Sequence, residues 1–547
     1  MIRKLAMAAS AALVVGCGGG DVNLTPTNID NSVDNSVTET GGGSNNPCAN
    51  YTDPATNTLV QGTFDGSNCT YDSSFVGATN PLTVDVTLPF ISGVHIFQDS
   101  LFIGENVDSG AAPAGGTGPT FTIPAGSTLA FLDSADYVLV NRGSQLIADG
   151  SPTAPITLTS FSDAVTGTAG PESVQQWGGV IINGNGITNN CTDDQRTNNQ
   201  CHVGAEGQPS NYGGSDNAES SGIFRYVVVK HTGFEVAPGD EINGVTFNAV
   251  GSGTVVEQMQ SYSTFDDGFE FFGGAVNLTN TIYVYVRDDS IDFSDGYIGT
   301  ITNALVIHSA QDGNRCIEGD NIGGGRFDSG EFASAPDGGA APITSPTINN
   351  LTCIMSAHDA GTHDPSEGPT FRRGPQFTLN NALIFAGYAA RDLGRNSNEC
   401  LEITNDLDEF WAQTGASSIS DSVIACTEAA KGSFAADDAV ADPAITAALN
   451  GDTVLNWVTD SATYPANVRN TVINDAADIA TVTANASLLE MNSFYTAAAP
   501  ADQNGTALTF GAAGDEQLGA VTRANDWTAG WSFGLDPNNR AQALWFE

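Results

Sequence analysis

Three segments of the chain repeat a pattern that brings carboxylates together. Residues 266–270, 288–292 and 314–318 each begin with two polar side chains and continue into an alternating strand. Because side chains of a strand alternate between its faces, burial of the apolar residues turns Glu270, Asp292 and Glu318 to the outer face. Neighbouring strands lie about 4.8 Å apart, so these three carboxylates, the carboxylate row, would be separated by about 4.8 and 9.6 Å. Like charges at this spacing require a cation, a basic neighbour or a raised pKa.

Three kinds of chemistry are compatible with the carboxylate row. The first is an acidic surface that is simply solvated. The second is a site for Ca²⁺ or another cation, which takes oxygen ligands. The ligands of such a site would be Asp266, Asp267, Glu270, Asp288, Asp289 and Asp292. The third is glycan cleavage, because carboxylate pairs about 5 or 9 Å apart serve retaining or inverting hydrolysis.

In the glycan-cleaving interpretation the catalytic residues would be Glu270, Asp292, Glu318 and Arg372. Arg372 is included because burial of Phe371 places the Arg372 side chain on the outer face, one step beyond Glu318. An arginine next to a row of carboxylates is electrostatically favourable. Glu402 is a candidate to continue the row.

The spacing of the repeats indicates a solenoid. Successive segments are separated by 22 and 26 residues, which is the length of one coil of a parallel β-helix. A second ladder consists of Asn280, Asn303, Asn350 and Asn381, each just before an apolar strand. Asparagine tolerates the left-handed conformation of a coil corner, where stacked side chains hydrogen-bond to one another. The 47 residues between Asn303 and Asn350 correspond to one coil plus a glycine-rich insertion at 319–341.

The sequences Phe-Thr-Ile-Pro-Ala-Gly-Ser-Thr-Leu-Ala-Phe-Leu at 121–132 and Ala-Pro-Ile-Thr-Leu-Thr-Ser-Phe at 154–161 resemble the opening coils of the pectin-lyase-like superfamily. The resemblance implies an all-β fold, a right-handed parallel β-helix with long loop insertions and a partly helical C-terminal cap. Relatives include polysaccharide lyases and glycoside hydrolases with sites on an outer strand face. The lyases use a lysine or arginine base and Ca²⁺, and the candidate bases here are Lys230, Arg287, Arg315 and Arg372.

The N-terminal sequence predicts export and a lipid anchor. Arg3-Lys4 and the apolar run 5–15 are typical of a signal peptide, 1–16, and are too short to span a bilayer. Val14-Val15-Gly16-Cys17 resembles the bacterial lipobox, which implies lipidation of Cys17 and anchoring in the outer membrane. Residues 17–47 would form the lipidated cysteine and a flexible tether of about 30 Å. We expect the β-helix body with its N-terminal cap at 48–425 and a C-terminal capping region at 426–547.

The other eight cysteines predict disulfides, since their number is even and the chain is exported. Nearest-neighbour pairing would join Cys48 to Cys69, Cys191 to Cys201, Cys316 to Cys353 and Cys400 to Cys426. Eight cysteines allow 105 connectivities, so this pairing is a preference among many.

The charge balance and the absent motifs exclude several functions. The formal net charge of −46 disfavours nucleic acid and anionic membrane surfaces as partners and attracts cations such as Ca²⁺. No glycine precedes a lysine as in a P-loop, and neither His-Glu-x-x-His nor Gly-x-Ser-x-Gly occurs.

The sequence therefore predicts a cell-surface lipoprotein that binds an extracellular polymer, with polysaccharide as the favoured class, along a flat acidic face. The alternative is a carbohydrate-active enzyme, a polysaccharide lyase or glycoside hydrolase. Phe272 and Tyr297 are expected beside the row, where sugars stack on aromatic rings. The insertion 189–221 is predicted to be a surface loop, and Trp527 to Trp531 are expected to pack on the C-terminal end of the β-helix.

Overall fold

The structure, a computed structural model, describes residues 46–237, 240–329, 342–356, 358, 365–388, 398–436, 443–510 and 517–547. The predicted signal peptide, the lipidation site Cys17 and nearly all of the predicted tether lie outside these residues. In the described part of the chain, no helix has the length and apolar character needed to cross a membrane.

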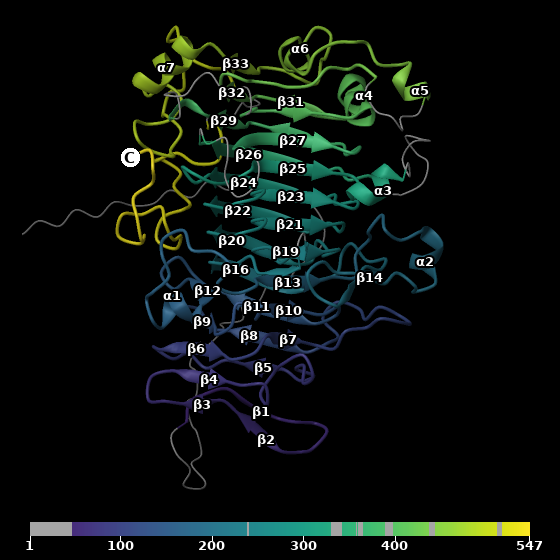
Figure 1. The fold of residues 1–547 in the computed structure, drawn as a ribbon, viewed down its shortest axis with the longest axis vertical. Coiled ribbons are helices and arrows are strands. Elements are labelled where there is room, and N and C mark those ends of the chain that lie inside the picture. The colour runs from purple at the N-terminus through teal and green to yellow at the C-terminus, as the bar shows by residue number, and fades with distance from the viewer. Residues whose placement is uncertain are drawn as a thin grey trace, which may run out of the picture. The chain divides into compact units, whose positions relative to one another are not determined.

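The body is a right-handed parallel β-helix, as the repeat predicts (Figure 1). One of its faces is a parallel sheet with one strand from each coil. In chain order its strands are β7 (Leu101–Ile103), β10 (Val138–Val140), β13 (Val180–Asn183), β19 (Val245–Asn248), β21 (Phe269–Phe272), β23 (Ile291–Ser294), β25 (Arg315–Asp320), β27 (Glu367–Arg372) and β30 (Glu402–Ile403).

A second, larger sheet forms the rest of the coils. In mid-stack its strands are long enough to turn a corner: β16 (Gly222–Lys230), β20 (Val255–Tyr262), β22 (Asn277–Val284), β24 (Thr300–Ile307) and β26 (Thr347–Ile354). In the coils on either side the corresponding strands are divided. They are β5 (Val86–Thr87), β6 (Val94–Phe97), β8 (Thr120–Ile123), β9 (Thr128–Phe131), β11 (Gln145–Asp149) and β12 (Ile156–Ser160), and then β28 (Thr378–Asn380), β29 (Leu383–Phe385), β31 (Ser418–Ser420), β32 (Val423–Ala425) and β33 (Thr471–Ile473).

The asparagine ladder forms the corner of these coils, and this prediction is confirmed. All four asparagines have positive φ, between 57° and 61°. Asn303 donates to Asn280 at 2.7 Å, Asn350 donates to Asn303 at 2.8 Å, and Asn381 donates to Asn350 at 2.7 Å. Each side-chain amide therefore hydrogen-bonds to the asparagine of the next coil. Its backbone meanwhile takes a conformation that few residues other than glycine adopt readily.

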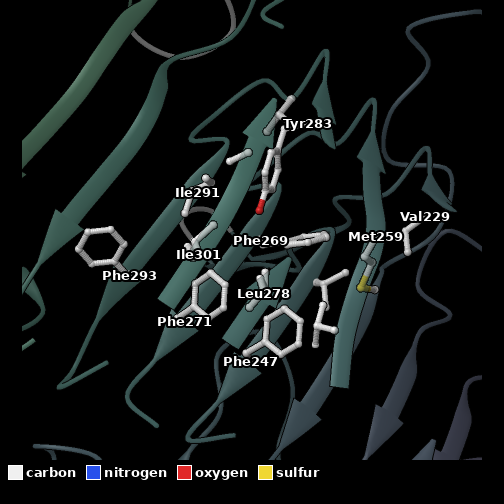
Figure 2. Close-up of a cluster of buried hydrophobic side chains, with 14 of the residues drawn as sticks. Val229, Phe247, Met259, Phe269, Phe271, Leu278, Tyr283, Ile291, Phe293 and Ile301 are labelled. Atoms are coloured by element: carbon white, nitrogen blue, oxygen red, sulfur yellow. The ribbon is translucent and has the colours of Figure 1, made fainter. Parts of the chain in front are cut away.

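The interior of the coils is filled by stacked apolar side chains. Phe247, Phe269, Phe271, Ile291 and Phe293 project inward from consecutive strands and are fully buried (Figure 2). Phe247 and Phe271 stack with ring centroids 5.1 Å apart. Burial of each such side chain contributes about 1.5–3 kcal/mol, so the core holds each strand of the first sheet in a fixed register.

Short strands and helices complete the structure. The remaining strands pair as β1 (Asn50–Thr52) with β2 (Leu59–Gln61), β3 (Thr63–Phe64) with β4 (Cys69–Tyr71), β14 (Val203–Gly204) with β15 (Asn211–Tyr212) and β17 (Glu235–Ala237) with β18 (Asp240–Glu241). The helices are α1 (Phe161–Ala164), α2 (Asp193–Thr197), α3 (Gly324–Asp328), α4 (Asp406–Thr414), α5 (Pro443–Thr446), α6 (Val454–Thr459) and α7 (Ala476–Ala484).

All four nearest-neighbour disulfides are confirmed, joining Cys48 to Cys69, Cys191 to Cys201, Cys316 to Cys353 and Cys400 to Cys426. The pairs joined by the first, third and fourth bonds are 21, 37 and 26 residues apart, about one coil or one coil with an insertion. The second bond, whose cysteines are 10 positions apart in the sequence, closes a loop within the 189–221 insertion.

The C-terminal residues do not occupy the place that the sequence suggested. The expectation that Trp527 and Trp531 pack on the end of the β-helix is wrong. Trp531 packs edge-on against Tyr226 of β16, and Gln260 of β20 exchanges two 2.8 Å hydrogen bonds with the backbone of Phe533. The last part of the chain thus lies along the side of the larger sheet, where the yellow segment runs in Figure 1. At the C-terminal end, α6 packs in its place, with Trp457 against Phe377.

Candidate functional site

The carboxylate row stacks in the predicted register. Glu270 of β21 pairs with Asp292 of β23, which pairs with Glu318 of β25. The row then continues through Thr370 of β27 to Glu402 of β30, in agreement with the suggestion that Glu402 extends it. Alternation with the buried phenylalanine and isoleucine residues puts all of these polar side chains on the face away from the core.

A second column of polar residues lies three positions before the row. The Asn243 side-chain oxygen accepts from the Asp267 backbone N–H at 3.1 Å, and Asp267 accepts from the Asp289 N–H at 3.0 Å. Asp289 in turn accepts from the Arg315 N–H at 2.8 Å. One carboxylate oxygen of each aspartate therefore fixes the turn of the next coil, and the second oxygen of Asp289 lies 3.9 Å from the Arg315 guanidinium.

Row and column meet in a dense group of carboxylates, which we call the acidic cluster. Its members are Asp266, Asp267, Glu270, Asp288, Asp289 and Asp292. Three overlapping groups have ligand oxygens within 4.8 Å of one another, and each could hold a metal ion. These groups are Asp266, Asp267 and Asp288; Asp267, Glu270 and Asp292; and Asp289, Asp292 and Glu318. The sequence thus places all of its proposed cation ligands in one region.

The acidic cluster is largely withdrawn from solvent. Glu270 is 7% exposed, Asp267 6% and Asp289 3%, whereas Asp266, Asp288 and Asp292 are partly exposed. Burial, followed by repulsion from Glu206 and Asp292, raises the pKa of Glu270 well above its ordinary value. Burial, followed by repulsion from Asp266 and Asp292, likewise raises the pKa of Asp267. Among the described ion pairs, none joins Asp266, Asp267 or Glu270 to a basic side chain.

The upper end of the row, by contrast, is neutralised. Arg315 pairs with Glu318 at 2.7 Å, and Arg372 pairs with both Glu318 and Asp320. Arg373 also pairs with Asp320. The sequence placed Arg372 one step beyond Glu318, but in the structure Arg372 lies opposite Asp320 and reaches across to Glu318. The reason is register: Thr370 is the residue opposite Glu318.

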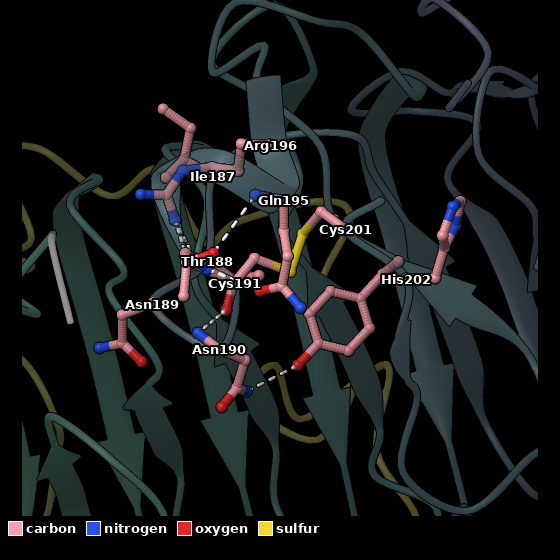
Figure 3. The surroundings of a disulfide bond; sticks show 12 residues. Ile187, Thr188, Asn189, Asn190, Cys191, Gln195, Arg196, Cys201 and His202 are labelled. Atoms are coloured by element: carbon pink, nitrogen blue, oxygen red, sulfur yellow. Dashed lines mark hydrogen bonds between the residues drawn. A yellow bond between two sulfur atoms is a disulfide. The ribbon is translucent and has the colours of Figure 1, made fainter. Parts of the chain in front are cut away.

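The predicted flat acidic face is wrong at this place, because the 189–221 insertion lies against the row at Glu270 and against the chain just after β25. Figure 3 shows the Cys191–Cys201 disulfide that closes part of this loop. Asn189 donates to the Asn321 carbonyl at 2.8 Å, beyond the end of β25. From the same insertion, Glu206 lies close enough to Glu270 for repulsion between the two carboxylates to raise the pKa of Glu270, and a shared proton or a cation between them would relieve that repulsion.

A buried arginine fixes the insertion to the body. Arg142 is 3% exposed and donates to the carbonyls of Cys201 at 3.0 Å and Gly213 at 2.7 Å. It also contacts the ring nitrogen of His202 at 2.7 Å. No sequence pattern marked Arg142, since its partners lie about 60 to 70 residues later in an irregular loop.

The expected aromatic platform is also corrected. Tyr297 is fully buried and stacks on Phe271 in the core, with centroids 4.5 Å apart. Phe272 is half-buried and lies near Tyr212 of the insertion. Neither ring is therefore an open surface for a sugar beside the row.

The candidate lyase bases form ion pairs with carboxylates of the protein. Lys230 pairs with Asp163 at 2.7 Å, is 7% exposed and lies over the ring of Phe533 at 4.1 Å. Arg287 pairs with Asp312 at 3.4 Å, Arg315 pairs with Glu318 at 2.7 Å, and Arg372 pairs with Glu318 and Asp320. A base that abstracts a proton must reach the substrate, and each of these side chains is instead paired with a carboxylate of the protein.

Comparison with known families gives one finding. The model of the pectate-lyase like β-helix domain matches residues 114–462, which is more than half of the chain. Comparisons with curated proteins and with solved structures give no significant match. The matched residues contain the stacked coils, the asparagine ladder, the carboxylate row and its covering insertion. By this match and by its fold, the chain belongs to the pectate-lyase-like β-helix domain family.

Proposed function

We propose that the protein is a cell-surface module that binds an extracellular polysaccharide without cleaving it, and that the acidic cluster holds Ca²⁺. The observation that carries the first part is the burial of Glu270 and Glu318, at 7% and 5% exposure, with Glu270 beside Glu206 of the insertion and Glu318 paired with Arg315 and Arg372. A nucleophile or general acid must touch the glycosidic bond. The β-helix family suggests polysaccharide binding. The burial of Glu270 and Glu318 disfavours catalysis at the carboxylate row.

The cation part of the proposal rests on a deficit of positive charge. The Asp267, Glu270 and Asp292 group has oxygens within 4.8 Å of one another and forms no described ion pair with arginine or lysine. The group that includes Glu318, by contrast, is paired with Arg315 and Arg372. In addition, the Oδ1 atom of Asp292 is enclosed and has no hydrogen-bond partner among the described residues. Ca²⁺ takes six to eight oxygen ligands in flexible geometry and suits such a site. The partly exposed Asp266, Asp288 and Asp292 leave a route for the ion from solvent.

Ca²⁺ would have a structural role here. Glu206 belongs to the insertion and Glu270 to the coil beneath it, and their carboxyl groups meet. A bound cation would neutralise both and would connect the insertion to strands β21 and β23. Contacts within the chain would then set the position of the insertion, and the ion would remove the repulsion between the Glu206 and Glu270 carboxylates.

The cellular location in this proposal comes from the N-terminal sequence. The apolar run 5–15 and Cys17 support export and lipid anchoring. Metabolic labelling with a palmitate analogue is expected to label the native chain and to fail after Cys17→Ala. Equal labelling of both proteins would refute the anchor.

One assay separates binding from cleavage. Purified protein is incubated with a panel of immobilised polysaccharides, with Ca²⁺ or with excess chelator, and retention is measured together with new reducing or unsaturated ends. We expect retention on at least one polymer and no new ends. Cleavage that Glu270→Gln abolishes, while Asp478→Asn on α7 leaves it intact, would overturn the proposal in favour of an enzyme. Retention on no polymer would refute binding.

A further inference from the structure

A cavity lies in the C-terminal segment, away from the carboxylate row. Its volume is about 190 Å³, and its walls come from residues 492–495, 523–537 and Glu547. We propose that this cavity binds one uncharged sugar ring of a polysaccharide. This inference rests on the proposed function and names the place and the chemical class of the ligand. Sites for drug-sized ligands occupy roughly 300–1,000 Å³, so a cavity of this size suits a single monosaccharide unit.

The walls of the cavity are held in place by hydrogen bonds. The Tyr388 hydroxyl bonds to the Ser493 carbonyl at 2.7 Å and accepts from the Ser493 N–H at 3.1 Å. The Tyr495 hydroxyl donates to Asp526 at 2.7 Å, and the Thr528 hydroxyl donates to the same carboxylate at 2.6 Å. A preformed site of this kind loses little conformational entropy when a ligand binds.

The lining offers both donors and acceptors for hydroxyl groups. Arg523 lies over the ring of Tyr495, at 4.5 Å from its centroid, and pairs with Glu490 through Nε. Among the described residues its Nη atoms have no hydrogen-bond partner. Asp536 uses Oδ1 for the Asn538 N–H at 2.7 Å, and its Oδ2 likewise has none there. A sugar hydroxyl donates and accepts at once, so it can bridge an arginine and an aspartate.

The cavity also provides an apolar surface for the carbon side of a sugar ring. Phe494 and Leu535 line it and are 5% and 4% exposed. The rings of Phe494 and Tyr495 lie 4.3 Å apart in a tilted arrangement. Apolar and aromatic walls with a few placed polar groups are typical of small-molecule sites.

The charges select an uncharged sugar. Asp526 and Asp536 have no basic partner among the described ion pairs, whereas the positive charge of Arg523 is shared with Glu490. Glu547 is neutralised by Arg540 at 2.8 Å. The lining therefore carries net negative charge, and the carboxylate of a uronate would be repelled. Neutral hexoses avoid this cost.

The test uses the full chain and four neutral probes, glucose, galactose, mannose and N-acetylglucosamine, with glucuronate as the charged comparison. Binding is measured by saturation-transfer NMR, and retention on the polysaccharide identified above is measured in parallel. Asp536→Asn and Arg523→Gln are expected to weaken neutral-sugar binding about tenfold each, the effect of losing one hydrogen bond to a charged group. The matched control is Arg469→Gln, because Arg469 is likewise a surface arginine in an ion pair, with Asp421.

The outcomes distinguish this inference from the proposed function. Binding of no neutral probe by the native chain, tighter binding of glucuronate, or an equal loss in the Arg469→Gln control would refute the cavity as a sugar site. Polymer retention that both cavity variants preserve would also refute it and leave the proposed function intact. If the native chain retains no polymer, the proposed function fails as well. Melting temperatures of the variants show that each is folded.

Discussion

Replacing Asp292 by asparagine is expected to stabilise the calcium-free protein and to remove much of the stabilisation that Ca²⁺ provides. Asp292 belongs to two of the three oxygen groups, and its Oδ1 atom lacks a hydrogen-bond partner. Asparagine keeps the shape of the side chain and removes the charge. The same substitution should therefore act in opposite directions with and without the ion, which a general effect on packing would not do.

The size of the effect follows from the spacing of the carboxylates. Two like charges 4.8 Å apart repel by about 3 kcal/mol at an effective dielectric constant of 20. Asp292 is partly exposed and the cluster shares protons, so about 1–2 kcal/mol of this should appear as stabilisation of the calcium-free protein. Ca²⁺ at 100 times its Kd should stabilise the native protein by about 3 kcal/mol, and the variant by less.

The assay is thermal unfolding of the native chain and the variant, in excess chelator and in saturating Ca²⁺. Asp478→Asn serves as control, because Asp478 lies on α7 outside the cluster. We expect the variant to melt above the native chain in chelator and below it in Ca²⁺, with no such crossing in the control. Mg²⁺ should replace Ca²⁺ poorly, since it demands compact octahedral geometry. A native melting temperature that is unchanged by Ca²⁺, or an Asp292→Asn variant with the full native response, would refute the cation site.

Three other substitutions test the surrounding structure. Burial raises the pKa of Glu219 to about 7, so the stability it contributes is present below about pH 4.5 and lost as the pH rises through 7. Glu219→Gln should therefore reduce the fall in stability over this range by up to about 3 kcal/mol, and melting curves with an unchanged pH dependence would contradict this. Arg142→Lys should cost at least about 2 kcal/mol and expose residues 189–221 to protease, because lysine cannot bridge the carbonyls that Arg142 holds. Unchanged proteolysis would show that the insertion is held by other contacts. Asn303→Ala should cost about 2–4 kcal/mol in urea unfolding, from the lost ladder bonds and a φ of +60°. Asn303→Gly should lose only the ladder hydrogen bonds, because glycine adopts a positive φ without strain. Equal losses of stability in the two variants would exclude a contribution from backbone strain.

The fold and the stacking of the row could be predicted because both depend on periodicity. A coil of 22 to 26 residues repeats the alternation of the strand, so Glu270, Asp292 and Glu318 must fall in line once their apolar neighbours are buried. The asparagine ladder follows from the same repeat. The disulfides Cys316–Cys353 and Cys400–Cys426 follow too, since neighbouring coils bring such pairs together.

The parts that the sequence did not predict depend on contacts without a period. Glu206 meets Glu270 across 64 residues, and Trp531 meets Tyr226 across 305, in segments that follow no repeat. Tyr297 was expected beside the row, yet it enters the core at a turn and stacks on Phe271. Alternation predicts which way a side chain of a strand points, but it does not predict what a loop later covers.

The distribution of charge along the row is the strongest argument that something beyond solvent completes it. At β25 and β27 the chain supplies Arg315, Arg372 and Arg373 to the carboxylates, and at β30 Lys431 pairs with Glu402 at 3.0 Å. At β21 Glu270 is as buried as Glu318, but its neighbours are the Asn243 amide and the Glu206 carboxylate instead of a basic side chain. A row that merely solvated the surface would need no cover, and a catalytic row would need access. A row that the chain neutralises at one end alone supports the proposed cation at the other end.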